Sequence, residues 1–187
     1  YQQYGIKPDI VTMAKGVASG YAAIALCVTT EAVFDMFKDD PNDPLGFFRD
    51  ISTFGGCTAG PAAALENMRI IEDEDLLGNC NAMGDRMMGN LQALMEKHEV
   101  IGDVRGKGLF LGCELVKDRE TKEPVDEADI AAIVGDCGAQ GVIIGSANRS
   151  VPGRNNVIAF SPALIATADD IDAITNAVDN ALTKVFG

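Results

Sequence analysis

The stretch that decides the fold of this 187-residue chain is PDIVTMAKGVASGY, from Pro8 to Tyr21. Its apolar residues Ile10, Val11 and Met13 lie between turn-forming residues, and this pattern predicts a short buried strand. Lys15 would then lie at the carboxyl end of that strand, where open α/β sheets place their chemistry. A desolvated lysine amine at such a position shifts toward the neutral, nucleophilic form. The alternative is a surface lysine that follows a strand, and the spacing alone does not separate the two.

A second motif, STFGG at residues 52–56, places two hydroxyl side chains beside two glycines. Hydroxyls and exposed backbone amides are donors that bind a phosphate, although such a stretch can also be a plain loop before a helix. In their order, the two motifs resemble the class III aminotransferases, which are fold type I enzymes that use pyridoxal 5'-phosphate. The resemblance covers nearly the whole chain. One departure lies at Cys57-Thr58, where the family usually has asparagine or histidine and then proline.

The resemblance implies roles for particular residues. Lys15 matches the lysine that forms the Schiff base and moves the proton, so it is expected to be both catalytic and cofactor-binding. The backbone of Ser52 and the side chain of Thr53 match the phosphate-binding loop, which in the family comes from the neighbouring subunit of a homodimer. An arginine before the strand at residues 157–160 is expected to bind the substrate carboxylate through its planar fork. Arg149 and Arg154 both precede that strand, and Arg149 is the preferred candidate, although a loop arginine in solvent is the alternative.

The composition excludes several other classes of function. A net charge of −13 argues against binding to nucleic acid or an anionic membrane, since both need a basic face. Five cysteines are scattered without a C-x-x-C pair, which favours free thiols in a cytoplasmic protein over disulfides or zinc. Neither a metal-binding cluster nor a membrane-spanning run is visible. His98, the one histidine, is expected at a helix end rather than in acid–base chemistry.

The expected fold class is α/β, in two parts. Residues 1–97 are predicted to be the C-terminal portion of a cofactor-binding large domain, a fragment of a mixed or parallel sheet with helices. Residues 98–187 are predicted to be a small α+β C-terminal domain. Apolar residues at helical spacing predict a helix over residues 76–95, and KDDPNDPLG at 38–46 predicts a surface loop.

Several local features are expected in the second part. Alternating apolar residues at 109–115 predict a half-buried strand, and short strands are predicted at 142–144 and 157–160. Thr167 and Asp170 form a capping signature for a last helix. Arg105, between glycine-rich turns, is expected to form a structural salt bridge.

The resemblance is to the carboxyl-terminal part of the family, in the group of ω-amino acid and amine transaminases that use pyruvate. It implies a small-molecule amine donor, a keto acid acceptor, a homodimer with shared active sites that can pair into a tetramer, and an upstream segment of the same protein that completes the site. The alternatives are another class III activity, such as a 4-aminobutyrate or ornithine aminotransferase, an aminomutase or a decarboxylase. From a different class, the chain could be a catalytically idle dimerisation module.

Overall fold

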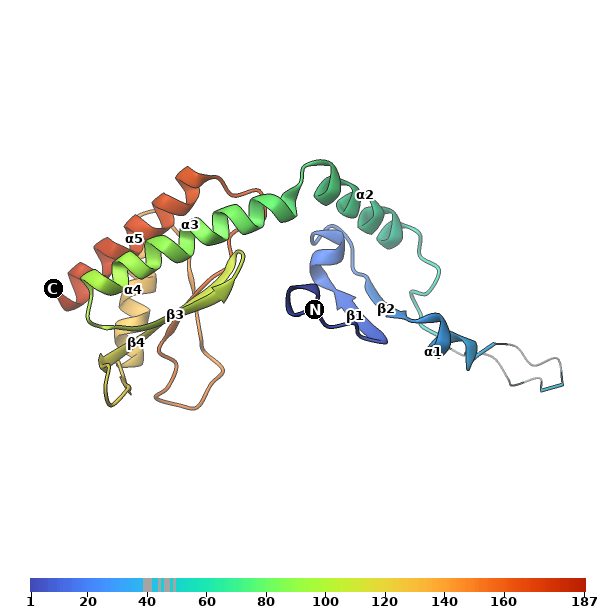
Figure 1. Cartoon of the computed structure of the whole chain (residues 1–187), viewed down its shortest axis with the longest axis horizontal. Helices are drawn as coiled ribbons and strands as arrows, with labels where there is room; N and C mark the ends of the chain where they lie inside the picture. Colours follow the sequence, from blue (N-terminus) through green and yellow to red (C-terminus); the bar gives the residue numbers. More distant parts are fainter. Residues whose placement is uncertain (39–41, 44, 46–47, 49) are drawn as a thin grey trace. The chain divides into compact units, whose positions relative to one another are not determined.

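The computed structural model describes residues 1–38, 42–43, 45, 48 and 50–187 (Figure 1). Most of the loop predicted at 38–46 therefore lies outside the described residues. The contacts divide the chain into two compact units, Tyr1–Glu74 and Asp75–Gly187. This division lies before the long helix of residues 76–97, whereas the predicted domain boundary lies after it. The assignment of the two parts to a large and a small domain stays a prediction.

The first unit is built on a two-stranded sheet and one long helix. Strand β1 (Ile10–Ala14) pairs with β2 (Ala25–Thr29) in antiparallel register. The sequence predicts a mixed or parallel sheet, whereas the pairing seen among the described residues of this unit is antiparallel. The predicted strand is present, but its burial is not, since Ile10 is 55% exposed. The other elements are η1 (Gln2–Tyr4), η2 (Lys15–Ala18), α1 (Glu31–Asp35) and α2 (Ala59–Asp73).

The second unit is an antiparallel sheet with helices. The strand order is β3 (Ile101–Lys107), β4 (Phe110–Asp118), β7 (Val157–Phe160) and β6 (Gly145–Ser146), and β5 (Glu123–Pro124) pairs with β4. The predicted strand at 142–144 is wrong, because the strand there covers Gly145–Ser146. A short apolar run has no periodicity that fixes its bounds. The helices of this unit are α3 (Leu76–Lys97), α4 (Glu127–Ala139) and α5 (Ala168–Phe186).

The main hydrophobic core lies entirely in the second unit. The predicted alternation is confirmed, since four alternate side chains of and before β4 are buried: Leu109, Leu111, Cys113 and Leu115. Strands β3 and β7 and helices α3, α4 and α5 also contribute to this core, and the fully buried Leu91 of α3 and Leu182 of α5 belong to it. In the first unit only Ala18 and Ala64 are buried among the described apolar residues. The second unit therefore holds most of the burial that stabilises the described chain.

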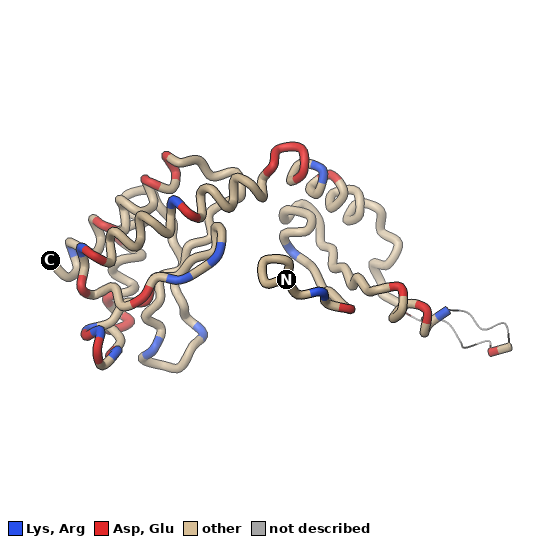
Figure 2. Tube along the Cα trace, viewed as in Figure 1, with Lys and Arg blue, Asp and Glu red and all other residues tan. Residues whose placement is uncertain are grey.

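Acidic residues occur along the helices and loops of both units (Figure 2). Several basic side chains are paired with them. Arg105 contacts Asp103 at 2.5 Å and Glu114 at 2.7 Å, which confirms the expected salt bridge. None of the helices in the described part of the chain is long and apolar enough to cross a membrane.

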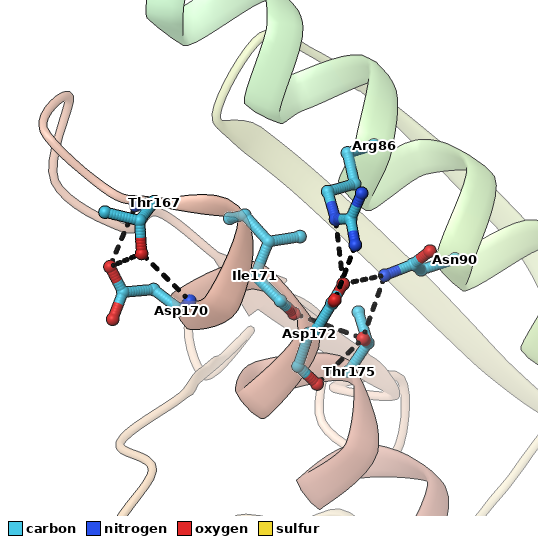
Figure 3. A network of polar contacts seen from close by, with 7 residues as sticks. All are labelled: Arg86, Asn90, Thr167, Asp170, Ile171, Asp172 and Thr175. Atoms are coloured by element: carbon cyan, nitrogen blue, oxygen red, sulfur yellow. Dashed lines mark hydrogen bonds and ion pairs between the residues drawn. The ribbon is translucent and has the colours of Figure 1, made fainter.

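Helices α3 and α5 lie side by side (Figure 1) and are joined by a polar network (Figure 3). Arg86 of α3 donates two hydrogen bonds to the carboxylate of Asp172, from Nε at 2.8 Å and from Nη2 at 2.5 Å. Asn90 donates to Asp172 and to the buried Thr175. The capping box predicted at the start of α5 is present, because the side chains of Thr167 and Asp170 bond each other's backbone amides.

His98 lies at the end of α3, as the sequence predicts. Its Nε2 atom lies 2.6 Å from a carboxylate oxygen of Asp179 on α5, which Lys97 also contacts at 2.7 Å. Arg119 donates to the carbonyl oxygens of Met95, His98 and Glu99, so it caps the same helix end. These contacts give His98 a structural partner and attach the end of α3 to α5.

Candidate active site

Lys15 is the first residue after β1, so the structure confirms its place at the carboxyl end of the strand. Its backbone is left-handed, with φ of 54°, and the turn that it begins closes on Ser19 with φ of 49°. Such a conformation costs a non-glycine residue about 1–2 kcal/mol and persists only where the surroundings hold it. The lysine side chain is exposed, so the described residues of this unit do not supply the desolvation that the sequence predicts.

The Lys15 turn is held by Asn67, a residue that the sequence analysis does not identify. From the middle of α2, its Nδ2 atom donates to the carbonyl oxygens of Gly16 and Val17, each at 3.0 Å. The carbonyl oxygen of Gly16 also accepts from the amide of Ser19 within the turn, so the asparagine adds bonds from another helix to the turn's own bond. A lone asparagine within a helix carries no motif, and only the fold brings it to this turn.

Ser52 and Thr53 lie in a tightly turned segment before α2. The amide of Gly55 donates to the carbonyl oxygen of Ser52 at 2.9 Å, and Gly56 has φ of 81°. The hydroxyl-bearing residues Ser52 and Thr53 are both exposed. This positive φ favours glycine at position 56, since other residues adopt it at a cost in free energy.

A pocket of about 1030 Å³ lies in the first unit beside this segment. The segment contributes Ser52 and residues 54–57, β1 contributes residues 12–14, and β2 with its approach contributes residues 22–27. The structure therefore brings Ser52 and the strand that ends at Lys15 to one pocket, while Lys15 and Thr53 are not among its lining residues. Most of the lining is small and apolar, which suits a flat ring more than a highly charged ligand. Among the described residues, no three His, Cys, Asp or Glu side chains are grouped to bind a metal ion.

Arg149 and Arg154 belong to the second unit, on the loop of residues 147–156 between β6 and β7. The sequence of this loop, ANRSVPGRNN, holds these two basic residues and no acidic one, and Figure 2 colours basic positions blue. Both arginines are exposed, and within the described residues neither guanidinium has a hydrogen bond or an ion pair. The other four described arginines are all engaged, by carboxylates (Arg69, Arg86 and Arg105) or by carbonyls (Arg119). These two are therefore the free guanidiniums of the described chain.

The carboxyl end of this loop is attached to the rest of the second unit by side chains that no sequence motif indicates. Glu127, at the start of α4, accepts from the amide of Gly153 at 2.9 Å and from Nδ2 of Asn155 at 2.8 Å. The buried Asn156 donates to the carbonyl oxygen of Leu115 at 2.7 Å. The bond from Asn155 holds the pKa of the Glu127 carboxyl below its ordinary value, and the bond from the Gly153 amide adds to this effect.

A family profile described as Aminotransferase class-III matches residues 1–182. The hypotaurine/taurine–pyruvate aminotransferase of Paracoccus denitrificans is 73% identical over 186 residues, and the match covers 100% of this chain and 40% of that protein. The taurine–pyruvate aminotransferase of Rhodobacter capsulatus is 65% identical over 185 residues, with 99% of this chain and 40% of that protein covered. The chain therefore spans about two fifths of the length of these relatives.

Solved structures agree with these matches. A Bacillus anthracis aminotransferase superimposes with a TM-score of 0.91 at 38% identity, over 98% of this chain and 40% of that one. An amine transaminase from an uncultivated Pseudomonas species, solved in its PLP-bound form, superimposes with a TM-score of 0.86 at 30% identity, over 98% of this chain and 40% of that one. The expected fold class, a fragment of a fold type I aminotransferase, is confirmed.

Proposed function

Because the chain belongs to the class-III aminotransferase family, we propose that the complete protein transfers an amino group from an amine or ω-amino acid to a keto acid, with Lys15 holding pyridoxal 5'-phosphate. The observation that carries the proposal is the position of Lys15. It is the first residue after β1, and a side chain from α2 fixes the turn that it begins. The left-handed backbone of Lys15, held by a side chain from another helix, supports a functional role for this lysine.

The residues of the first unit fit the cofactor in part. They supply a primary amine at Lys15, two exposed hydroxyls at Ser52 and Thr53, and a pocket with a largely apolar lining. When bound, the cofactor supplies the electron sink for the carbon from which the proton is removed. We assign the covalent attachment to Nζ of Lys15. The same atom, once freed, takes the proton from the amino-bearing carbon of the donor.

The phosphate contacts are assigned to the backbone of Ser52 and the hydroxyl of Thr53. A phosphate needs several donors at one place, and a hydroxyl beside a glycine-rich turn provides them. We place these contacts across the subunit interface of a homodimer, so that each subunit completes the site of the other. The upstream part of the complete protein would contribute the remaining walls, and pairing of dimers into a tetramer is compatible with this arrangement.

Pyruvate is the proposed acceptor, and an ω-amino acid with an acidic group, of the taurine type, is the proposed donor. The names of the Paracoccus denitrificans and Rhodobacter capsulatus relatives support this choice. Arg149 is the proposed binder of the acidic group, because its guanidinium is free and a planar fork binds two oxygens of a carboxylate or a sulfonate. The free state of all five cysteines supports the proposal of a cytoplasmic enzyme.

Chemical trapping of the lysine tests the proposal directly. The complete protein is incubated with the cofactor, reduced with sodium borohydride, digested and mapped by mass spectrometry. We expect the cofactor mass on Lys15, and its disappearance in Lys15→Ala together with the loss of alanine formation from pyruvate. Lys7→Ala is the matched control, since Lys7 is an exposed lysine of the same unit and should leave trapping unchanged.

The outcomes separate the alternatives. A protein that traps no cofactor on Lys15 would be the idle dimerisation module. Trapping without transfer from any amine donor would favour an aminomutase or a decarboxylase. Initial rates with pyruvate and with 2-oxoglutarate would distinguish the proposed reaction from a 4-aminobutyrate or ornithine aminotransferase.

A further inference from the structure

We propose that Glu127 is a positioning residue that braces the loop of residues 147–156 and so presents the guanidinium of Arg149 to the acidic group of the substrate. The inference rests on the proposed function for the identity of that group. The bracing itself stands on contacts within the second unit. Glu127 lies at the start of α4, far from Arg149 in the sequence, and no motif connects the two.

The brace is a chain of hydrogen bonds that ends beside Arg149. One carboxylate oxygen of Glu127, Oε1, accepts from the amide of Gly153 and from the side-chain amide of Asn155. The amide oxygen of the same asparagine, Oδ1 of Asn155, accepts from the backbone amide of Ser150 at 3.0 Å. Ser150 directly follows Arg149, so the backbone on the carboxyl side of the arginine is held by Asn155 and, through it, by Glu127.

The loop needs such a brace because little else holds it. Residues 148–154 are all exposed, and apolar burial therefore does not order this segment. Gly153 has φ of 77°, and the amide of Arg154 closes a local turn on the carbonyl oxygen of Val151. The next residues are anchored, since Asn156 bonds the backbone of Leu115 through both its side chain and its carbonyl oxygen. Glu127 holds Gly153 and Asn155, and Asn155 holds Ser150, so the ordered backbone continues from residue 156 back to residue 150.

A mobile arginine would bind an anion less tightly than a positioned one, because ordering the loop would then cost free energy at the moment of binding. The brace lowers that cost and leaves the guanidinium itself unpaired. An ion pair to Arg149 would compete with the substrate, whereas bonds to Gly153 and Asn155 do not. The arrangement thus affects substrate affinity through loop order, without contact between Glu127 and the substrate.

Steady-state kinetics of the complete holoenzyme with taurine and pyruvate test the positioning role. In Glu127→Ala we expect the KM values for both substrates to rise about two- to tenfold, the range that corresponds to the loss of one or two hydrogen bonds, with kcat nearly unchanged. Glu127→Gln should restore most of the affinity, since both bonds end on one oxygen that an amide can replace. Asn155→Asp should behave like Glu127→Ala, because it places two carboxylates together.

Asp129→Asn is the matched control. Asp129 lies in the same first turn of α4, so its removal alters the charge at the helix start equally. Within the described residues its side chain has no hydrogen bond or ion pair, and we expect parental KM values. A KM increase in Asp129→Asn equal to that in Glu127→Ala would assign the effect to the helix charge and overturn the brace.

Hydrogen exchange measures the brace without reference to activity. In the complete protein we expect the peptide that covers residues 150–155 to exchange faster in Glu127→Ala than in the parent or in Glu127→Gln. Parental exchange and parental KM values in Glu127→Ala would overturn the inference. A parent protein that fails to form alanine would count against the proposed function instead, and the exchange result would still decide whether Glu127 holds the loop.

Discussion

The side-chain amide of Asn67 lies 3.0 Å from the carbonyl oxygen of Gly16, so α2 holds the turn that begins at Lys15. We predict that Asn67→Ala loosens this turn at a cost of about 1 kcal/mol for each of the two hydrogen bonds lost. Asn67→Asp should cost more, since a carboxylate would face two carbonyl oxygens. Urea unfolding of the complete protein measures the cost, and borohydride trapping measures the effect on Lys15.

Glu72→Ala is the control for this prediction, because Glu72 is an exposed residue of the same helix whose side chain has no hydrogen bond or ion pair among the described residues. We expect the free energy of unfolding of this variant to lie within about 0.5 kcal/mol of that of the parent. If Asn67→Ala and Glu72→Ala trapped the cofactor at the same rate and unfolded alike, the turn would not depend on Asn67.

The contacts of Asn67 and Glu127 are not predictable from the sequence, unlike those of several local motifs. Lys15 is predictable because a strand followed by small residues is a local pattern, and the capping box of Thr167 and Asp170 is equally local. Asn67 and Glu127 act on residues 51 and 26 positions away, respectively, and nothing in their own neighbourhoods indicates those partners. The exposure of β1 is likewise not predictable, since an apolar strand pattern does not indicate which other elements cover the strand.

The second unit should fold without the first, because it holds the whole main core. We predict that a protein of residues 75–187 unfolds in one cooperative transition. Within it, Leu91→Ala should cost about 2–5 kcal/mol, since Leu91 is fully buried and its removal leaves a cavity. Leu77→Ala on the same helix is the control. Leu77 is 65% exposed, so its removal should cost about 0.5 kcal/mol or less.

Denaturant titrations of the three proteins provide the measurement. Equal costs for Leu91→Ala and Leu77→Ala would mean that α3 does not pack in the isolated unit as it does here. A gradual transition without a folded baseline would mean that the core of this unit depends on residues outside it.

Asp172 gives the second unit a stabilising contribution that depends on pH. The hydrogen bonds from Arg86 and Asn90 lower the pKa of its carboxyl below the ordinary 3.8. A lowered folded-state pKa stabilises the protein above the unfolded-state value, and the contribution is lost as the pH falls through the folded-state value. We predict that Asp172→Asn is less stable than the parent at neutral pH and that the difference shrinks below a pH of about 3.8.

Urea unfolding at neutral pH and in acid checks this sign. Asp85→Asn is the control, because Asp85 is an exposed residue of α3 without an ion pair among the described residues. A difference between Asp172→Asn and the parent that stayed constant with pH would show that Arg86 and Asn90 do not favour the charged carboxylate.

Cys113 should report the opening of the core by its chemical reactivity. It is fully buried in β4, and burial raises the pKa of its thiol to about 12. Only the thiolate reacts with alkylating reagents, and at a pH of about 8 its fraction would be about 10⁻⁴. In the protein of residues 75–187 we therefore predict that the half-buried Cys80 is labelled by iodoacetamide first. Cys113 and Cys137 should be labelled only at the rate of unfolding, and their labelling should accelerate in Leu91→Ala but not in Leu77→Ala. Fast labelling of Cys113 in the absence of denaturant would show that β4 is open to solvent on its core side.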